Sequence, residues 1–262
     1  MARQLMAGAP WAGALACGLA GLALAPGAWA QSAPGGLRLG LSAGYTHYSE
    51  PQMQLAGAHL GLHLRWAQPR GLENWAFEAH ALLGAPDYSS PVSGTIDRRP
   101  TVQTAWRALY GKPVGTEPAA RFEAGLEWQA YYNDLRGTTS RGDVGYERER
   151  YGLWAVAAYQ APVAGAQAWG AQSWRLEAAV LLQGWAVSRL SQVSTVYDDT
   201  VNRQNRGLAL RAQRSYRHAP GWFTPYVSVS WLDDSDIKRK PSYTVKEPTN
   251  TTWQLGVKWF WQ

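Results

Sequence analysis

The chain has 262 residues, a formal net charge of +6 at pH 7 and a single cysteine. Its 25 basic and 19 acidic residues are interspersed, and the longest basic run is Lys238-Arg239-Lys240, so we expect no nucleic-acid partner. There are 15 Trp, 13 Tyr and 27 Gly residues, but only 4 Phe and 3 Met. Abundant Trp and Tyr are typical of a surface at a membrane–water boundary, and abundant Gly is typical of turns and crowded strands.

The first thirty residues differ in composition from the rest of the chain. Arg3 is their only charged side chain, an Ala-, Leu- and Gly-rich run follows, and Ala28-Trp29-Ala30 forms a small-x-small cleavage pattern. These features predict a signal peptide for the Sec pathway, residues 1–30, cleaved after Ala30. The alternatives are an uncleaved membrane anchor and a lipoprotein attached through Cys17. Two prolines that interrupt the apolar run, and the position of Cys17 in its middle, argue against both.

Removal of 30 of the 262 residues leaves a chain of 232, residues 31–262, which suits a single β domain. This chain has no cysteine, so no disulfide can stabilise it. It also has no apolar run of about 18 residues, so no transmembrane helix is predicted. For an exported protein, the mild positive excess favours contact with anionic lipid or lipopolysaccharide.

Ten segments of the mature chain alternate apolar and polar side chains with a period of two. In one of them Trp174 and Leu176 face one way, whereas Arg175 and Glu177 face the other. Each segment is close to the length of about 9–11 residues that a tilted strand needs to cross a bilayer. The ten segments are residues 37–49, 57–66, 75–83, 101–111, 121–132, 150–160, 174–186, 207–214, 223–231 and 253–262.

The connectors between these segments alternate in length. Those at 50–54, 87–100, 133–148, 188–206 and 233–250 are mostly long and polar, whereas the four between them are short and rich in Pro and Gly. Long loops on one side, short turns on the other and an even strand count are typical of outer-membrane barrels. Closing the sheet would also pair every backbone group in lipid. We therefore predict an all-β fold, a closed antiparallel up-and-down transmembrane β-barrel of about ten strands over residues 31–262. A soluble, lipocalin-like periplasmic barrel is the alternative.

The end of the chain, Trp253 to Gln262, resembles the C-terminal β-signal of Gram-negative outer-membrane barrel proteins. That pattern is polar, any, Gly, any, any, aromatic, any, aromatic, and its defined positions are filled by Gln254, Gly256, Trp259 and Trp261. The chain continues one residue past the last aromatic, to Gln262. The resemblance implies location in the cell outer membrane, partners in the barrel-assembly machinery and periplasmic chaperones, and closure of this strand against the first. In size the chain resembles the ten-stranded omptin and adhesin-type barrels.

The polar faces of the ten segments carry charges that we expect to face the lumen. A barrel of ten strands has a narrow interior, which Arg–carboxylate pairs would fill and lock. The alternative is a selective pore for small anions, attracted by the cationic excess. The expected lumen charges are Arg38, Arg65, Glu78, Arg107, Arg121, Glu123, Glu127, Arg150, Arg175, Glu177, Arg211 and Lys258.

The chain partly resembles two families of barrel enzymes. Omptin proteases use an Asp pair and an Asp-x-His at the extracellular rim, but the acidic pairs Asp198-Asp199 and Asp233-Asp234 have no histidine beside them. Lipid A deacylases carry a lipid-facing His-x-Ser late in the chain; His47 and Ser49 form such a pair here, but in the first segment. They are the candidate catalytic residues, and a His-Ser pair without chemistry is the alternative.

The acidic loop clusters could bind divalent cations that bridge lipopolysaccharide, or simply be solvated loop tips. No zinc-ligand spacing, phosphate-binding Gly loop or nucleophile elbow occurs, so neither a metal site nor a cofactor is predicted. We expect first a structural or surface-interaction barrel with a largely plugged lumen. A narrow porin for small anions is the second hypothesis, and a lipid-A-modifying enzyme is the third.

Deletion of Trp261 together with Gln262 is expected to abolish assembly, because it removes the terminal aromatic of the β-signal. The measurement is the heat-modifiable shift of the folded barrel on a gel. Deletion of Gln262 alone is the matched control and should preserve the shift. A normal shift after the double deletion would count against an assembly role for Trp261.

Overall fold

The computed structural model describes residues 36–70, 73–114, 117–163, 172–218, 221–240 and 243–261. The expected signal peptide and its cleavage site after Ala30 lie outside these described residues.

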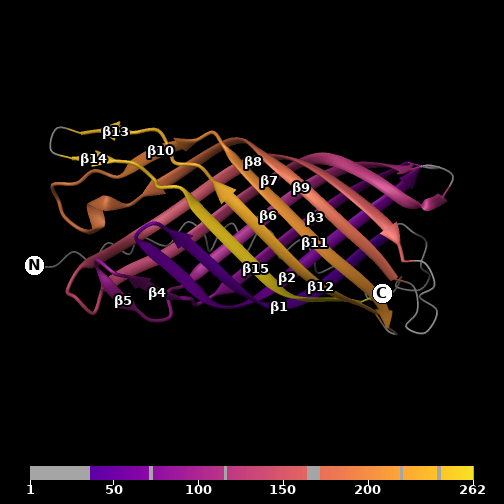
Figure 1. Cartoon of the computed structure of the whole chain (residues 1–262), viewed down its shortest axis with the longest axis horizontal. Helices are drawn as coiled ribbons and strands as arrows, with labels where there is room; N and C mark the ends of the chain where they lie inside the picture. The colour runs from indigo at the N-terminus through magenta and orange to yellow at the C-terminus, as the bar shows by residue number, and fades with distance from the viewer. Residues whose placement is uncertain are drawn as a thin grey trace, which may run out of the picture. The chain divides into compact units, whose positions relative to one another are not determined.

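Ten strands of the described chain form a closed antiparallel barrel in which each strand pairs with the next along the chain (Figure 1). The last strand pairs with the first, from Leu39 opposite Trp261 to Ser49 opposite Thr251, and this pairing closes the barrel. The predicted fold class is thereby confirmed. The strands are β1 (Gly36–Glu50), β2 (Met53–Arg70), β3 (Glu73–Gly84), β6 (Thr101–Val114), β7 (Glu117–Thr138), β8 (Val144–Pro162), β9 (Gln172–Ser188), β11 (Gly207–His218), β12 (Gly221–Leu232) and β15 (Asn250–Trp261).

The two ends of the barrel differ, and we name them here. At the turn end β1 begins and β15 ends, and β2–β3, β6–β7, β8–β9 and β11–β12 are connected (Figure 1). At the loop end lie the longer connectors, among them residues 85–100, 189–206 and 233–249. This asymmetry is the one that the connector lengths predict.

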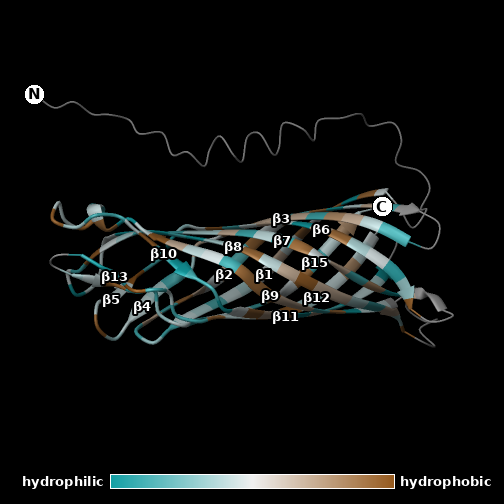
Figure 2. Ribbon diagram, turned by 90° about the horizontal axis from the view of Figure 1, so that it is seen from above, coloured by the Kyte–Doolittle hydropathy of each residue, from teal (hydrophilic) through white to brown (hydrophobic). Residues whose placement is uncertain are grey.

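Side chains alternate between the two faces of the barrel wall, and apolar and polar residues accordingly alternate along the strands (Figure 2). On β9, Leu176 is 54% exposed, whereas Arg175 and Glu177 point inward and are buried. Aromatic rings gather toward both ends of this outer face: Trp75 packs on Tyr110 near the turn end, with ring centroids 5.1 Å apart. An outer face of this kind is suited to lipid, because exposed apolar area in water carries a free-energy cost. No helix among the described residues is long and apolar enough to cross a membrane.

Several strands are longer than the sequence predicts. β7 has 22 residues and β8 has 19, so only residues 139–143 remain of the long connector predicted at 133–148. At about 3.3 Å per residue, β7 is roughly 70 Å long, far more than a bilayer core of about 30 Å requires even at a tilt. The barrel therefore extends beyond the apolar band at the loop end. The apolar alternation ends at the edge of the apolar band, but the backbone pairing of the strands continues beyond it. The predicted strands were therefore too short.

Short strands also occur within residues predicted to be loops. They are β4 (Asp87–Ser90), β5 (Gly94–Ile96), β10 (Thr200–Gln204), β13 (Lys238–Arg239) and β14 (Thr244–Val245). β4 and β10 pair with the barrel strands β2 and β9, whereas β13 and β14 pair with each other.

One predicted face is wrong in β9. Leu153 pairs with Gln183 and Trp154 with Leu181, so Leu182 is an extra residue, a β-bulge. Beyond the bulge the faces exchange, and Gln183, expected in the lumen, points outward and is exposed. Leu181, just before the bulge, keeps the alternation of Arg175, Glu177 and Ala179 and points inward beside Trp154.

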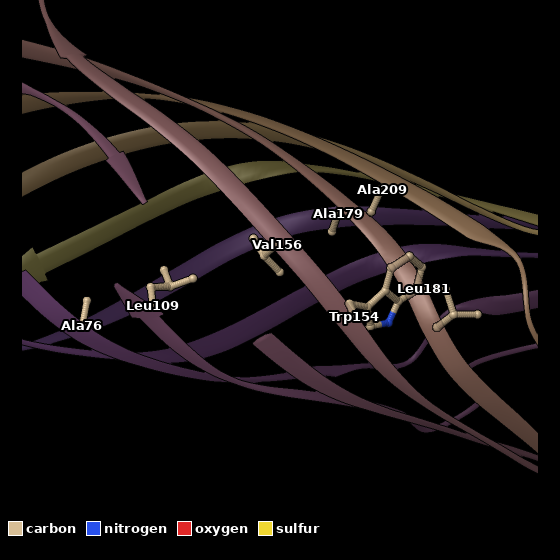
Figure 3. Packing of buried hydrophobic residues seen from close by; sticks show 7 residues of the cluster. All are labelled: Ala76, Leu109, Trp154, Val156, Ala179, Leu181 and Ala209. Carbon is tan, nitrogen blue, oxygen red and sulfur yellow. The ribbon is translucent and has the colours of Figure 1, made fainter. Parts of the chain in front are cut away.

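Trp154 and Leu181 belong to an apolar cluster on the lumen side of the wall (Figure 3). Trp154 is only 2% exposed. Gly152 makes room for it, because a Cβ there would lie 2.6 Å from the indole Nε1. The other members of the cluster are Ala76, Leu109, Val156, Ala179 and Ala209.

Leu126→Arg is expected to destabilise the barrel by about 2–4 kcal/mol, because it places a charge on the lipid face within the apolar band. The measurement is reversible urea unfolding in lipid vesicles. Val144→Arg is the matched control: Val144 and Leu126 are both 50% exposed, but Val144 lies at the loop end, where we expect less than about 1 kcal/mol. Equal destabilisation by the two substitutions would contradict the assigned position of the apolar band.

Candidate functional site

Four arginines and four glutamates from six strands meet in the lumen, and we call this set the mid-lumen network. The arginines lie on β2, β6, β9 and β11, and the glutamates on β3, β7 and β9. The formal charges of the eight side chains cancel. The members are Arg65, Arg107, Arg175 and Arg211 with Glu78, Glu123, Glu127 and Glu177.

Arg107 contacts three of the four glutamates of the mid-lumen network. Its Nη1 lies 3.3 Å from Glu78 Oε2 and 3.1 Å from Glu177 Oε2, and its Nε contacts Glu127. Glu127 is also bound by Arg211, whose Nη2 lies 2.6 Å from its Oε1. The network thus joins strands that are far apart in the sequence and lie across the lumen from one another.

The rest of the network extends toward the turn end. Arg65 Nη2 lies 2.9 Å from Glu123 Oε1, and Arg175 also contacts Glu123. Arg175 Nε lies 3.5 Å from Glu177 Oε2, which links this part to Arg107. Each glutamate therefore contacts at least two guanidinium groups. Removing one member of such a buried set typically costs about 3–5 kcal/mol, because its partner is left buried and uncompensated.

The other expected lumen cations lie outside this network. Arg150 lies toward the loop end between two rings, with its Cζ 4.3 Å from the Tyr48 centroid and 4.6 Å from the Tyr131 centroid. Arg38 and Lys258 line a cavity on the turn-end side, as does Arg121. The sequence predicted that these side chains face the lumen. It did not predict that some cations join the mid-lumen network and others lie outside it.

Two cavities flank the mid-lumen network. The cavity on the turn-end side has a volume of about 420 Å³, and the one on the loop-end side about 80 Å³. Both have Gln103, Arg211, Ser228 and Gln254 in their walls, so these side chains separate them. Gln254 Nε2 donates to Gln103 Oε1 at 2.7 Å, which bridges the lumen between β15 and β6.

Three lumen histidines were given no role by the sequence analysis, although the period-two pattern puts them on the polar face. His59 Nε2 lies 2.8 Å from the Tyr226 hydroxyl, and His63 Nε2 lies 2.8 Å from Ser42 Oγ. The rings of His63 and His80 are 5.6 Å apart. These contacts tie β1, β2, β3 and β12 together beside the turn-end cavity.

A second missed cluster fastens the loop of residues 233–249 to the barrel, and we call it the loop-end latch. Its members are Glu50, Arg148, Ser188 and Glu247. Arg148 Nη2 lies 2.6 Å from Glu50 Oε1 and also contacts Glu247. Ser188 Oγ donates to Glu247 Oε1 at 2.6 Å. Glu247 is only 4% exposed although it lies in a loop without periodic pattern, which is why sequence reasoning did not find it.

The latch determines the ionisation of Glu247. Burial would raise the pKa of this carboxyl group, but the charge of Arg148 and the hydrogen bonds from Ser188 and Arg148 outweigh it. The pKa of Glu247 is therefore held below its ordinary value.

The candidate catalytic pair His47 and Ser49 lies on the outward face of β1, toward the loop end. The residues directly opposite His47 are Ala56 and Trp253, and those opposite Ser49 are Gln54 and Thr251. None of these neighbours is a carboxylate that could orient the histidine. The catalytic role of the pair stays a prediction, and an unchanged lipid A acylation pattern in cells carrying His47→Ala would end it.

The acidic residues of the two predicted loop clusters, at 198–199 and 233–236, have cationic partners. Asp198 pairs with Lys240 at 3.2 Å, Asp199 with Arg189 at 3.3 Å, and Asp236 with Lys238 at 2.7 Å. Among the described residues, no group of His, Cys, Asp or Glu is arranged to hold a metal ion.

The four β-signal residues lie on the closing strand, β15. Gly256 faces Gly44 of β1, and a Cβ at Gly256 would lie 2.5 Å from the Ala43 carbonyl oxygen, so this seam requires glycine. Trp261 is 44% exposed at the turn end, and Gln254 points into the lumen. Their role in assembly remains a prediction.

A closed, even-stranded barrel with an apolar outer face, a charged lumen, short turns at one end and long loops at the other is an outer-membrane β-barrel. The sequence matches no protein-family model and no curated protein.

Solved structures that are similar include three barrels. The outer membrane protease OmpT from Escherichia coli has 11% sequence identity and a TM-score of 0.49, over 89% of this chain and 99% of that one. Neisserial surface protein A has 9% identity and a TM-score of 0.40, over 86% and 96%. The translocator domain of the autotransporter NalP from Neisseria meningitidis has 11% identity and a TM-score of 0.43, over 96% of each chain.

Acidification is expected to release the loop of residues 233–249. Because the folded-state pKa of Glu247 is lowered, its contribution to stability is present above its ordinary pKa of 4.5 and is lost as the pH falls below that value. Hydrogen exchange of this loop, measured by mass spectrometry between pH 7 and pH 3, should therefore rise steeply in acid after correction for intrinsic rates. Glu247→Gln should raise exchange already at pH 7. Asp97→Asn, at an exposed loop carboxylate, is the control and should leave the profile unchanged. A flat profile in the unmodified protein would refute the latch.

Proposed function

We propose that this outer-membrane barrel does not conduct solutes and works at its loop end as a surface-interaction protein of a Gram-negative cell. It would be exported by the Sec pathway, with the signal peptide cleaved after Ala30. Periplasmic chaperones and the barrel-assembly machinery would then place the loop end outside and the turn end in the periplasm. The observation that carries the proposal is the mid-lumen network.

A solute crossing the lumen would have to break this network. Glu127 is 0% exposed and Glu123 is 1% exposed, so these carboxylates have no water to replace a lost arginine. Separating a buried pair leaves both charges uncompensated in a medium of low dielectric constant. The bridge between Gln103 and Gln254 closes the gap beside the network. Both features favour a barrel that is plugged by its own side chains.

The loop end offers an ordered surface for a partner. Asn202 Nδ2 of β10 donates to the carbonyl oxygens of Asp236 and Val245, at 2.9 and 3.1 Å. Tyr197 packs edge-on against Tyr243, with centroids 5.0 Å apart. These contacts link the loops at 189–206 and 233–249 into one module.

This module carries exposed apolar and basic side chains. Val196 is 70% exposed and Ile237 52% exposed, so both side chains are available to a partner. Arg206, whose side chain is 81% exposed, adds positive charge at the same end. Lipopolysaccharide of the outer leaflet, which is anionic, is the lipid partner that we propose for this rim.

A narrow anion-selective porin is the second candidate, because the turn-end cavity holds Arg38, Arg121 and Lys258 in addition to the neutral network. In a surface-interaction barrel the mid-lumen network stays closed to solutes, whereas in a porin it opens to let anions pass.

Conductance in planar bilayers tests both candidates. We expect no discrete opening steps from the refolded protein. Glu127→Ala combined with Arg211→Ala removes one ion pair without changing the net charge, and it should produce steps, selective for anions. Asp134→Ala with Arg136→Ala is the control, because this pair, 2.7 Å apart, lies at the loop end with Arg136 half exposed; the barrel should stay closed. Steps in the unmodified protein would overturn the plugged barrel and favour the porin, and a silent Glu127/Arg211 variant would show that the network is not the barrier.

A further inference from the structure

The turn-end cavity has the size and lining of a small-molecule site. Its volume of about 420 Å³ is within the range of about 300–1,000 Å³ that ligand pockets occupy. Charged and amide side chains line it together with the rings of Trp222, Tyr226 and Phe260. Residues at the turn end, such as Gly36 and Ser215, contribute to the same wall.

Two cations in this cavity have no carboxylate partner among the described residues. The Arg38 guanidinium lies over the Trp222 ring, 5.7 Å from its centroid. Lys258 Nζ lies 3.3 Å from Gln213 Oε1 and 4.8 Å from the Tyr226 centroid. The glutamates of the mid-lumen network are already shared among its own four arginines. A cation held in a narrow lumen without a countercharge costs free energy, which a bound anion would offset.

On three residues that line the cavity, a buried polar atom has no hydrogen-bond partner among the described residues. Arg175 Nη2 and Trp222 Nε1 are donors, and Asn74 Oδ1 is an acceptor. The Arg175 side chain is 6% exposed, and its Nη2 lies 3.8 Å from Glu78 Oε1, beyond hydrogen-bonding distance. Asn74 is likewise 6% exposed as a residue. Buried polar atoms are nearly always paired, so unpaired atoms on residues that line a cavity point to a ligand there.

The unpaired groups define the chemistry of the ligand. Oxygens of a phosphate or carboxylate would accept from Arg38, Lys258 and Arg175. Asn74 Oδ1 can only accept, so the same ligand must also donate, as a hydroxyl group does. We propose that the turn-end cavity binds a small sugar carrying a phosphate or carboxylate group. Given the orientation in the proposed function, this ligand would enter from the periplasm.

Calorimetric titration of the refolded protein in detergent tests the proposal without requiring a membrane orientation. The probes are glucose 6-phosphate and gluconate, with neutral glucose and inorganic phosphate for comparison. We expect saturable binding of at least one sugar anion, none of glucose, and weaker binding of phosphate. A folded barrel that binds neither sugar anion, or that binds glucose equally well, would overturn the proposal. Because conductance is not measured, failure here leaves the plugged-barrel proposal standing.

Substitutions locate the site. Arg38→Gln and Lys258→Gln should each weaken binding of the sugar anion about tenfold or more, because each removes a charge-assisted hydrogen bond. Arg38→Lys keeps the charge and should retain more affinity than Arg38→Gln. Arg136→Gln at the loop end should change nothing. Unaltered affinity in the folded Arg38→Gln, Lys258→Gln double variant would place the ligand elsewhere and refute this cavity as the site.

Asn74→Ala tests the hydroxyl contact separately. It should weaken binding of the sugar anion while leaving that of inorganic phosphate unchanged, because phosphate does not need this acceptor. The heat-modifiable gel shift confirms that each variant is folded. An equal loss for both probes would contradict the role assigned to Asn74.

Discussion

The pairing of β15 with β1 is the constraint on which the rest of the structure depends. In lipid a free sheet edge would leave a row of backbone N–H and C=O groups without partners, at several kcal/mol each. The pairs from Leu39–Trp261 to Ser49–Thr251 remove that edge. Once the sheet is closed, each strand has one lipid face and one lumen face, and charged side chains within the span are largely confined to the lumen face. Closure therefore concentrates charge in a narrow interior.

The charged side chains of the lumen fall into two groups, those that pair with one another and those that do not. Four arginines and four glutamates can share their charges among themselves, and they do so at mid-height, where Arg107 and Glu127 meet. Within the part of the chain that the structure describes, Arg38, Arg150 and Lys258 have no carboxylate partner, and they lie on either side of the network. Arg150 is stabilised by two tyrosine rings, whereas Arg38 and Lys258 face an open cavity. The charged residues of the lumen thus form the mid-lumen network and also part of the wall of the turn-end cavity.

The sequence predicts well which face of the barrel wall each side chain takes. It predicts poorly where along the barrel axis that side chain lies. Period two assigns Arg175 inward and Leu176 outward, because only one parity fits lipid. It does not say which glutamate Arg175 reaches, since that depends on the stagger between neighbouring strands, a property of the closed barrel and not of any segment. A single extra residue, Leu182, reverses the parity for Gln183. Glu247 lies outside all periodic patterns, and its partner Arg148 is 99 residues away.

The length of β7 and β8 bears on how a partner would be recognised. The two strands stay paired beyond the apolar band, as far as Thr138 opposite Val144. This pairing, interrupted by one register shift between Asp134 and Gly137, holds the ends of the two strands in place, so they have little conformational freedom to lose on contact. Ordering flexible side chains and loops is one of the main costs of association. A partner of the loop end would therefore meet a surface already in its binding geometry, and a small contact area could suffice for useful affinity.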